Sequence, residues 1–147
     1  MANEYKGVSC IMPLRFEATQ NALTSGGPTS NQVVMTISAE SGASDGDAIT
    51  MPFDGAIVGI AIEIEGMNAN ESISAQPTID GVEISGNVTT VVGVAGLHAY
   101  ATFMPDAYPV ERGEEIGAEI YSTTGVTTTD PADTVVTVFV QIGSSNT

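Results

Sequence analysis

A large apolar side chain stands at every second position of Val58-Gly59-Ile60-Ala61-Ile62-Glu63-Ile64. The same alternation returns in Val136-Thr137-Val138-Phe139-Val140-Gln141-Ile142, near the C-terminus. Because successive side chains of a β-strand point to opposite faces, both stretches predict strands that bury one face in a core. No strongly apolar stretch repeats with the helical period, so the sequence predicts an all-β protein.

Shorter runs of similar character surround these two strands. Together they predict about eight or nine strands, at residues 32–38, 48–53, 56–65, 72–79, 82–84, 89–94, 97–104, 116–122 and 134–142. Asp80-Gly81, between two of them, is typical of a tight hairpin turn. So many short strands in 147 residues favour a single jelly-roll-like antiparallel β-sandwich at residues 21–147. An immunoglobulin-like sandwich is the main alternative, although the chain has no Trp and only one Cys.

Residues 1–20 differ in charge from the rest of the chain. Lys6 and Arg15 balance Glu4 and Glu17, so this segment is locally neutral. We interpret it as an extended N-terminal arm or as an edge strand. Pro13 would restrict any strand here to the edge of a sheet, because Pro cannot donate a hydrogen bond to the ladder.

The charge balance of the whole chain limits its partners. Eighteen acidic residues stand against three basic ones, which gives a net charge of −15. Phosphate backbones and anionic lipid surfaces would repel such a protein, so we expect neither nucleic acid nor a membrane as a partner. The acidity favours solubility at high concentration, and adaptation to high salt is the alternative.

Cysteine content and the N-terminus indicate where the protein is made. Cys10 is the single cysteine, so no disulfide can form within the chain. The first residues lack a basic region followed by an apolar core, and no apolar run approaches the ~20 residues of a membrane helix. We expect synthesis in a cytoplasm without export.

Nucleophilic catalysis has little support in the sequence. His98 is the only histidine, which excludes a site with several His ligands, and we expect it on a strand face shared with Tyr100 and Thr102. Residues 42–46 match Gly-x-Ser-x-Gly, but that elbow requires a following helix, and none is predicted. We therefore expect no triad.

Carboxylates are numerous but form no recognisable site. Glu63 and Glu65 share a strand face, as the paired carboxyls of glycosidases could, yet the chain has few aromatic residues to hold a sugar. Asp45, Asp47 and Asp54 lie in or near a Gly-rich loop without the spacing of a calcium-binding EF-hand. The sequence predicts no enzyme, no metal and no cofactor.

Three stretches together resemble a known family. Residues 51–60 (MPFDGAIVGI) resemble a strand start of small head-decoration proteins of tailed viruses. Residues 101–103 (ATF), 108–110 (YPV) and 111–117 (ERGEEIG) are similar to a later strand of that group, with Glu114 where Asp is more usual. Residues 130–133 (DPAD) precede a final core strand in the same way. The resemblance covers roughly residues 48–142, and jelly rolls of head fibres and tail tips share such motifs.

This resemblance implies a capsid decoration, or cement, protein of a bacteriophage virion. Proteins of that kind bind the major capsid protein at the outer capsid surface as homotrimers and stabilise the head. Faces such as Val34, Thr36 and Ser38, or Val135, Thr137 and Phe139, could supply the subunit contacts. For the contact with the capsid we expect residues 1–20 to dock, with the side chains that follow: Lys6, Ile11, Leu14, Arg15 and Phe16.

A receptor- or glycan-binding module of a viral head fibre or tail fibre is the alternative function. Its site would lie on loops such as residues 24–31 and 123–130, because loops on a rigid scaffold commonly carry recognition. Thr and Asp in these loops can hydrogen-bond sugars, although the loops contain no aromatic residue.

Overall fold

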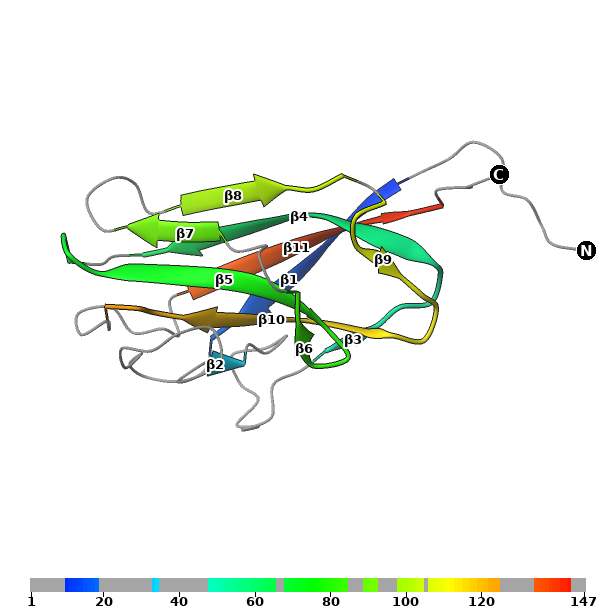
Figure 1. Cartoon of the computed structure of the whole chain (residues 1–147), viewed down its shortest axis with the longest axis horizontal. Helices are drawn as coiled ribbons and strands as arrows, with labels where there is room; N and C mark the ends of the chain where they lie inside the picture. The colour runs from blue at the N-terminus through cyan, green and yellow to red at the C-terminus, as the bar shows by residue number, and fades with distance from the viewer. Residues whose placement is uncertain are drawn as a thin grey trace, which may run out of the picture.

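The protein is a β-sandwich, as the alternating sequence pattern predicted (Figure 1). The computed structural model describes residues 10–18, 33–34, 48–65, 68–84, 89–92, 98–104, 106–124 and 134–143. Over these ranges the chain forms eleven strands and no helix. Every pair of neighbouring strands is antiparallel.

The first sheet has five strands, in the order β1-β11-β4-β8, with β9 also paired to β4. Their bounds are β1 Cys10–Glu17, β4 Gly55–Ile64, β8 His98–Thr102, β9 Pro109–Val110 and β11 Thr134–Ile142. We call it the five-stranded sheet. β11 lies at its centre, with β1 along one side and β4 along the other.

The second sheet has six strands, in the order β2-β10-β5-β6, with β3 paired to β10 and β7 paired to β5. Their bounds are β2 Val33–Val34, β3 Ile49–Thr50, β5 Ser72–Ile79, β6 Val82–Glu83, β7 Thr89–Val92 and β10 Glu115–Tyr121. Three pairs of short strands, β2 with β3, β6 with β7, and β8 with β9, each share one neighbour. The eleven strands therefore fill eight positions, in the order of a jelly roll.

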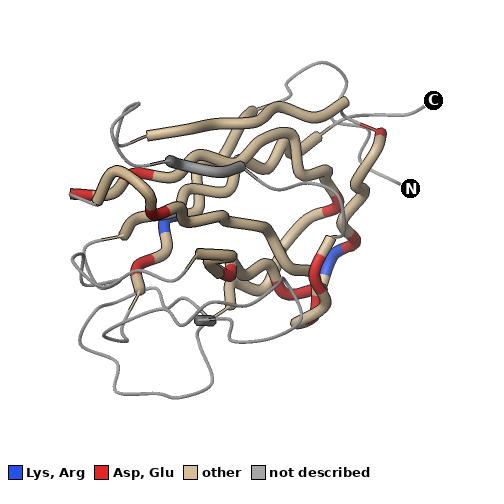
Figure 2. The backbone as a smooth tube through the Cα atoms, turned by 60° about the vertical axis from the view of Figure 1, so that its left-hand side comes forward, with Lys and Arg blue, Asp and Glu red and all other residues tan. Residues whose placement is uncertain are grey.

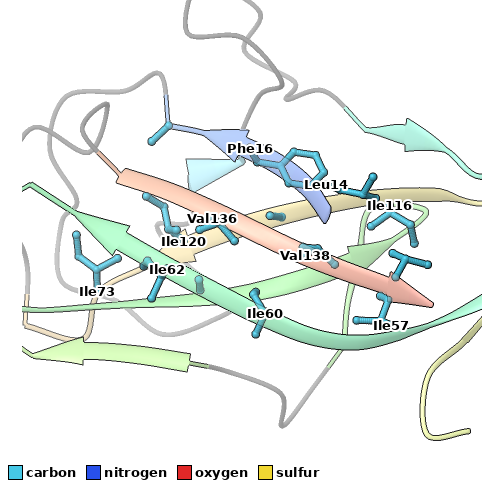
Figure 3. Close-up of a cluster of buried hydrophobic side chains, with 14 of the residues drawn as sticks. Leu14, Phe16, Ile57, Ile60, Ile62, Ile73, Ile116, Ile120, Val136 and Val138 are labelled. Atoms are coloured by element: carbon cyan, nitrogen blue, oxygen red, sulfur yellow. The ribbon is translucent and has the colours of Figure 1, made fainter. Parts of the chain in front are cut away.

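The core lies between the two sheets (Figure 3). Apart from one point in β4, each long strand contributes every second side chain, as its pleat requires. The fully buried apolar side chains include Phe16 of β1, Ile60 and Ile62 of β4, Ile73 of β5, Ile116 and Ile120 of β10, and Val136 and Val138 of β11. β-Branched residues dominate this set, which fits their preference for a pleated surface.

A β-bulge changes the inward face of β4. The register between β4 and β11 shifts at Phe139/Val140, where Val58 has no partner on β11. Ile57 and Ile60 consequently both point into the core, and Val58 is only half-buried. The expectation that Val58 shares a face with Ile60, Ile62 and Ile64 was therefore wrong at its first residue. One extra residue in a strand reverses which face the preceding side chains occupy.

Two further sequence features lie where backbone geometry allows them. Asp80 and Gly81 have φ of 51° and 74° and join β5 to β6 as the predicted hairpin. Pro77 lies inside β5, opposite Ala118 of β10. The Pro77 carbonyl accepts a hydrogen bond from the Ile84 N–H. The ring nitrogen of Pro77 therefore faces the same edge of β5, away from β10, at the point where the neighbouring strand changes from β7 to β6. The missing N–H therefore leaves the ladder with β10 intact.

Candidate functional site

β1 settles the position of four of the five residues that we expected to dock on a capsid. β1 pairs with β11 along its whole length, as an edge strand of the five-stranded sheet. Phe16 has no exposed surface and Leu14 is buried, so neither side chain can contact a partner, and this part of the expectation was wrong. Ile11, 62% exposed, and Arg15 point the other way, into solvent. Lys6 lies outside the described residues.

The outer face of the five-stranded sheet unites two groups of residues that the sequence suggested separately. Arg15 of β1 lies opposite Thr137 of β11, which in turn lies opposite Ala61 of β4. Tyr100 of β8 continues this row on the far side of Ala61. The exposed residues of β1 and the proposed subunit contacts on β11 therefore belong to one surface.

A groove runs along β4 on this outer face. Gly59 of β4 has no side chain and Ala61 has only a methyl group, whereas their neighbours on β11 and β8 include Phe139 and Tyr100. The result is an open hollow of about 420 Å³ with an almost wholly apolar lining. Its main lining residues are Ile11, Val58, Gly59, Ala61, Tyr100 and Phe139. We call it the β4 groove.

The bulge and Gly59 together form the floor of the β4 groove. The bulge leaves Val58 on the outer side, where it lines the hollow. A Cβ added at Gly59 would lie 3.1 Å from the Ala101 carbonyl oxygen and 3.6 Å from Phe139 Cδ2, so the absence of a side chain lets both approach. A glycine inside an otherwise regular strand pattern is the one sequence signal that could have indicated this site.

The charged side chains of the same face lie outside the lining of the groove. The Arg15 guanidinium donates a hydrogen bond to the Glu17 carboxylate, and Glu63 lies opposite His98 across β4 and β8. The lining of the β4 groove contains no charged residue. Figure 2 shows the described acidic residues mainly at turns and strand ends. In a chain of net charge −15, the groove is therefore a neutral surface.

The six-stranded sheet carries polar side chains on its outer face that are nevertheless buried. Gln76 of β5 and Glu119 of β10 lie opposite each other, and Gln76 Nε2 donates a hydrogen bond to Glu119 Oε2 at 3.3 Å. Burial raises the pKa of the Glu119 carboxyl, the bond from Gln76 partly offsets this, and the charge of Glu83 adds to it. Their hydrogen bond makes this pair a structural contact between β5 and β10.

The residues that we considered for catalysis and metal binding fall only partly within the described ranges. His98 is exposed, with Tyr100 and Thr102 on its face as predicted. Asp54 Oδ1 accepts the Arg112 backbone N–H at 2.8 Å. No group of three or more metal-ligating side chains occurs among the described residues. Residues 42–47, with the Gly-x-Ser-x-Gly match and two of the Asp residues, lie outside them.

No helix in the described part of the chain is long and apolar enough to cross a membrane.

Comparison with known proteins adds little to this geometry. No family model matches the chain, and no curated protein matches it. Among solved structures, it is similar to the native structure of a family 35 carbohydrate binding module from Clostridium thermocellum. The two are 14% identical with a TM-score of 0.40, and the match covers 88% of this chain and 97% of the other.

Proposed function

We propose that the chain is a capsid decoration protein of a tailed virus. It binds the outer surface of the capsid as a homotrimer, contacts the major capsid protein and stabilises the head without catalysing a reaction. The observation that supports this proposal best is the β4 groove, a neutral apolar surface on an otherwise strongly acidic molecule. Exposed apolar surfaces rimmed by polar residues are characteristic of sites of protein association.

The docking segment that we propose is smaller than residues 1–20. Leu14 and Phe16 belong to the core, so they are removed from the docking set. Ile11 lines the β4 groove, so we assign it to that surface. The capsid contact then consists of residues 1–9, which include Lys6, and the exposed Arg15. Lys6 and Arg15 are two of the three basic residues in the chain, and they give this end the least acidic character.

Cosedimentation with virus heads that lack the protein tests the function. We expect the full chain to bind heads to a reproducible saturation, and a chain without residues 1–9 to lose that binding. A deletion of residues 1–20 would be uninformative, because it removes β1 and with it Leu14 and Phe16 from the core. Arg112→Glu is a control for the loss of a positive charge, since Arg112, in the turn between β9 and β10, is the one basic residue outside residues 1–20.

The two parts of the proposal fail separately in this experiment. Heads that never bind the full chain would exclude the decoration function. Heads that bind the deleted chain as well as the full chain would exclude only the docking segment.

Glycan binding is the alternative function, and one observation favours it. Tyr100 is 76% exposed beside the β4 groove, and an exposed aromatic ring can hold a sugar. The nearly complete lack of polar groups in the lining disfavours it, because a sugar needs hydrogen-bond partners. A glycan array with the full chain distinguishes the two, since reproducible binding that Tyr100→Ala abolishes would support the alternative.

A further inference from the structure

The described residues expose five large apolar side chains, Ile11, Phe53, Val82, Tyr100 and Met104. Ile11 and Tyr100 are accounted for, since they line the β4 groove. Phe53 is the one that stands apart: it is 60% exposed, whereas Phe16 and Phe103 pack in or against the core and Phe139 lines the groove. An exposed aromatic ring on a soluble acidic protein is a candidate anchor for a partner.

The turn that carries Phe53 is held by hydrogen bonds on both of its sides. Before it, Met51 is buried, its N–H donates to the Glu114 carbonyl at 2.8 Å, and its carbonyl accepts from Gly113 N at 2.8 Å. After it, the Asp54 carboxylate accepts the Arg112 N–H at 2.8 Å. The backbone that carries Phe53 is therefore held in place, which lowers the entropy lost when this turn is bound.

Phe53 does not fill the β4 groove of its own chain. It precedes β4, whereas the groove lies from Val58 onward, and the strand from Gly55 to Gly59 already spans about 13 Å. Phe53 and Tyr100 are also both largely exposed, so neither covers the other. The ring and the groove are thus two separate apolar surfaces on one molecule.

Charge makes a second copy of this chain the occupant that fits the groove. Two chains of net charge −15 repel each other, and the repulsion is smallest where the contact contains no carboxylate. The lining of the β4 groove adds no carboxylate to the contact, so the carboxylates near it are those beside Phe53, such as Asp54. A basic partner would instead be attracted to the acidic turns and strand ends.

The size of the groove indicates a ring rather than a pair. Four strands at about 4.8 Å spacing and four residues along β4 give a face of roughly 250 Å² in projection. A stable interface usually needs about 800 Å² on each partner, so one such contact is weak by itself. A contact between two different surfaces can be repeated around a closed ring, where each copy uses both its ring and its groove.

We propose that Phe53 of one copy inserts into the β4 groove of the next, and that three such contacts close the trimer. This inference rests on the proposed function for the number of copies in the ring. Because the contact is small and the chains repel each other, the trimer forms more readily in molar salt than in dilute buffer.

Light scattering after size exclusion, at low and at molar salt, measures the assembly directly. We expect the full chain to reach about 45 kDa, three times the 15.1 kDa chain, with a larger trimer fraction at molar salt. Phe53→Ser and Tyr100→Ser should each weaken a contact by roughly thirtyfold, as expected for a central aromatic anchor. Val82→Ser is the matched control, because Val82 is 64% exposed and lies outside the groove.

A crosslink locates the contact independently of these substitutions. Benzoylphenylalanine in place of Phe53 keeps an aromatic ring and reacts on illumination with whatever it touches. In a mixture of nitrogen-15 and unlabelled chains, we expect crosslinked peptides that join the two isotopes and contain residues of β1, β4, β8 or β11. All of the substituted chains should unfold at the urea concentration of the parent, since the changed side chains are exposed.

Several results would overturn the proposal: a monomer at both salts, a trimer that Phe53→Ser leaves intact, equal losses in Val82→Ser, or crosslinks that reach other strands. None of these results depends on heads. If the chain binds heads but gives one of these results, the decoration function stands and the contact between Phe53 and the groove is refuted. If the chain forms the contact but does not bind heads, only the contact stands.

Discussion

Truncation of Phe16 to Ala should destabilise the whole sandwich, although Phe16 lies in the strand nearest the N-terminus. Its side chain has no exposed surface, and β1 pairs with β11 at all eight of its residues. A buried aromatic side chain removes roughly 150–250 Å² from water, which at about 25 cal/mol per Å² is worth about 4–6 kcal/mol. Measured losses for Phe→Ala in cores are about 3–5 kcal/mol. We expect about 3–4 kcal/mol here, because an edge strand can partly close the space left behind.

Urea unfolding monitored by circular dichroism gives this loss. With a denaturant dependence of about 2 kcal/mol per M for a domain of this size, the midpoint should fall by about 1.5–2 M. Ile11→Ala in the same strand is the control, and it should change stability by less than about 0.5 kcal/mol because Ile11 is exposed. If the two variants unfold at the same urea concentration, β1 is a detachable arm and its assignment to the core is refuted.

Three further substitutions test the interpretation of the sheets. Glu119→Gln should stabilise the protein at pH 7 and have less effect at pH 4. Burial raises the pKa of the Glu119 carboxyl, so the stability that its protonated form contributes is present below the usual pKa of 4.5 and is lost as the pH rises through the raised pKa. Equal effects at the two pH values in urea unfolding would contradict this. Gly55→Ala should cost about 2–3 kcal/mol, because the new Cβ would contact the backbone carbonyl oxygen of Gln141, which cannot move without disturbing β11; a melting temperature within one degree of the parent would disprove it. Asp80→Ala should lower the free energy of unfolding by about 1–2 kcal/mol in the same assay. It removes the acceptor of a 2.8 Å hydrogen bond from the backbone N–H of Glu115 in β10, and it places Ala at a φ of 51°. Asp80→Gly should recover the part of this loss that comes from the positive φ.

The alternation of apolar residues was sufficient to predict the sandwich and most of its core. It identified β4 and β11, because a strand buried on one face must alternate along its whole length. It did not reveal the bulge, since the extra residue keeps the sequence apolar on both sides of Val58 and only the register with β11 exposes the change of face. β9 was missed for a different reason: two residues contain too little sequence to show any period.

The candidate site could be predicted only in part. In β1, the same alternation places Ile11 and Arg15 on one face and Leu14 and Phe16 on the other. The expected docking set combined both faces, because its residues were chosen for lying in residues 1–20. The β4 groove depends on which small residue of β4 lies beside which large residue of β8 and β11, and cross-strand register is not encoded within a single strand. The burial of Glu119 was equally hidden, because a carboxylate at a polar position of an alternating strand is normally expected in solvent.

The bulge in β4 also bears on how reliably the chain reaches its native pairing. In an unbroken ladder, a slip of two residues keeps every side chain on its proper face, so hydrophobic burial alone barely distinguishes the correct alignment from the slipped one. Val58 is the extra residue of the bulge, and β11 accommodates it opposite the step from Phe139 to Val140. Any slip of β4 along β11 moves Val58 away from that step, so misaligned chains should revert to the native register rather than accumulate. This correction of the strand register would benefit a protein that is produced in many identical copies, because a misaligned molecule that returns to the native register cannot carry the error into an ordered assembly.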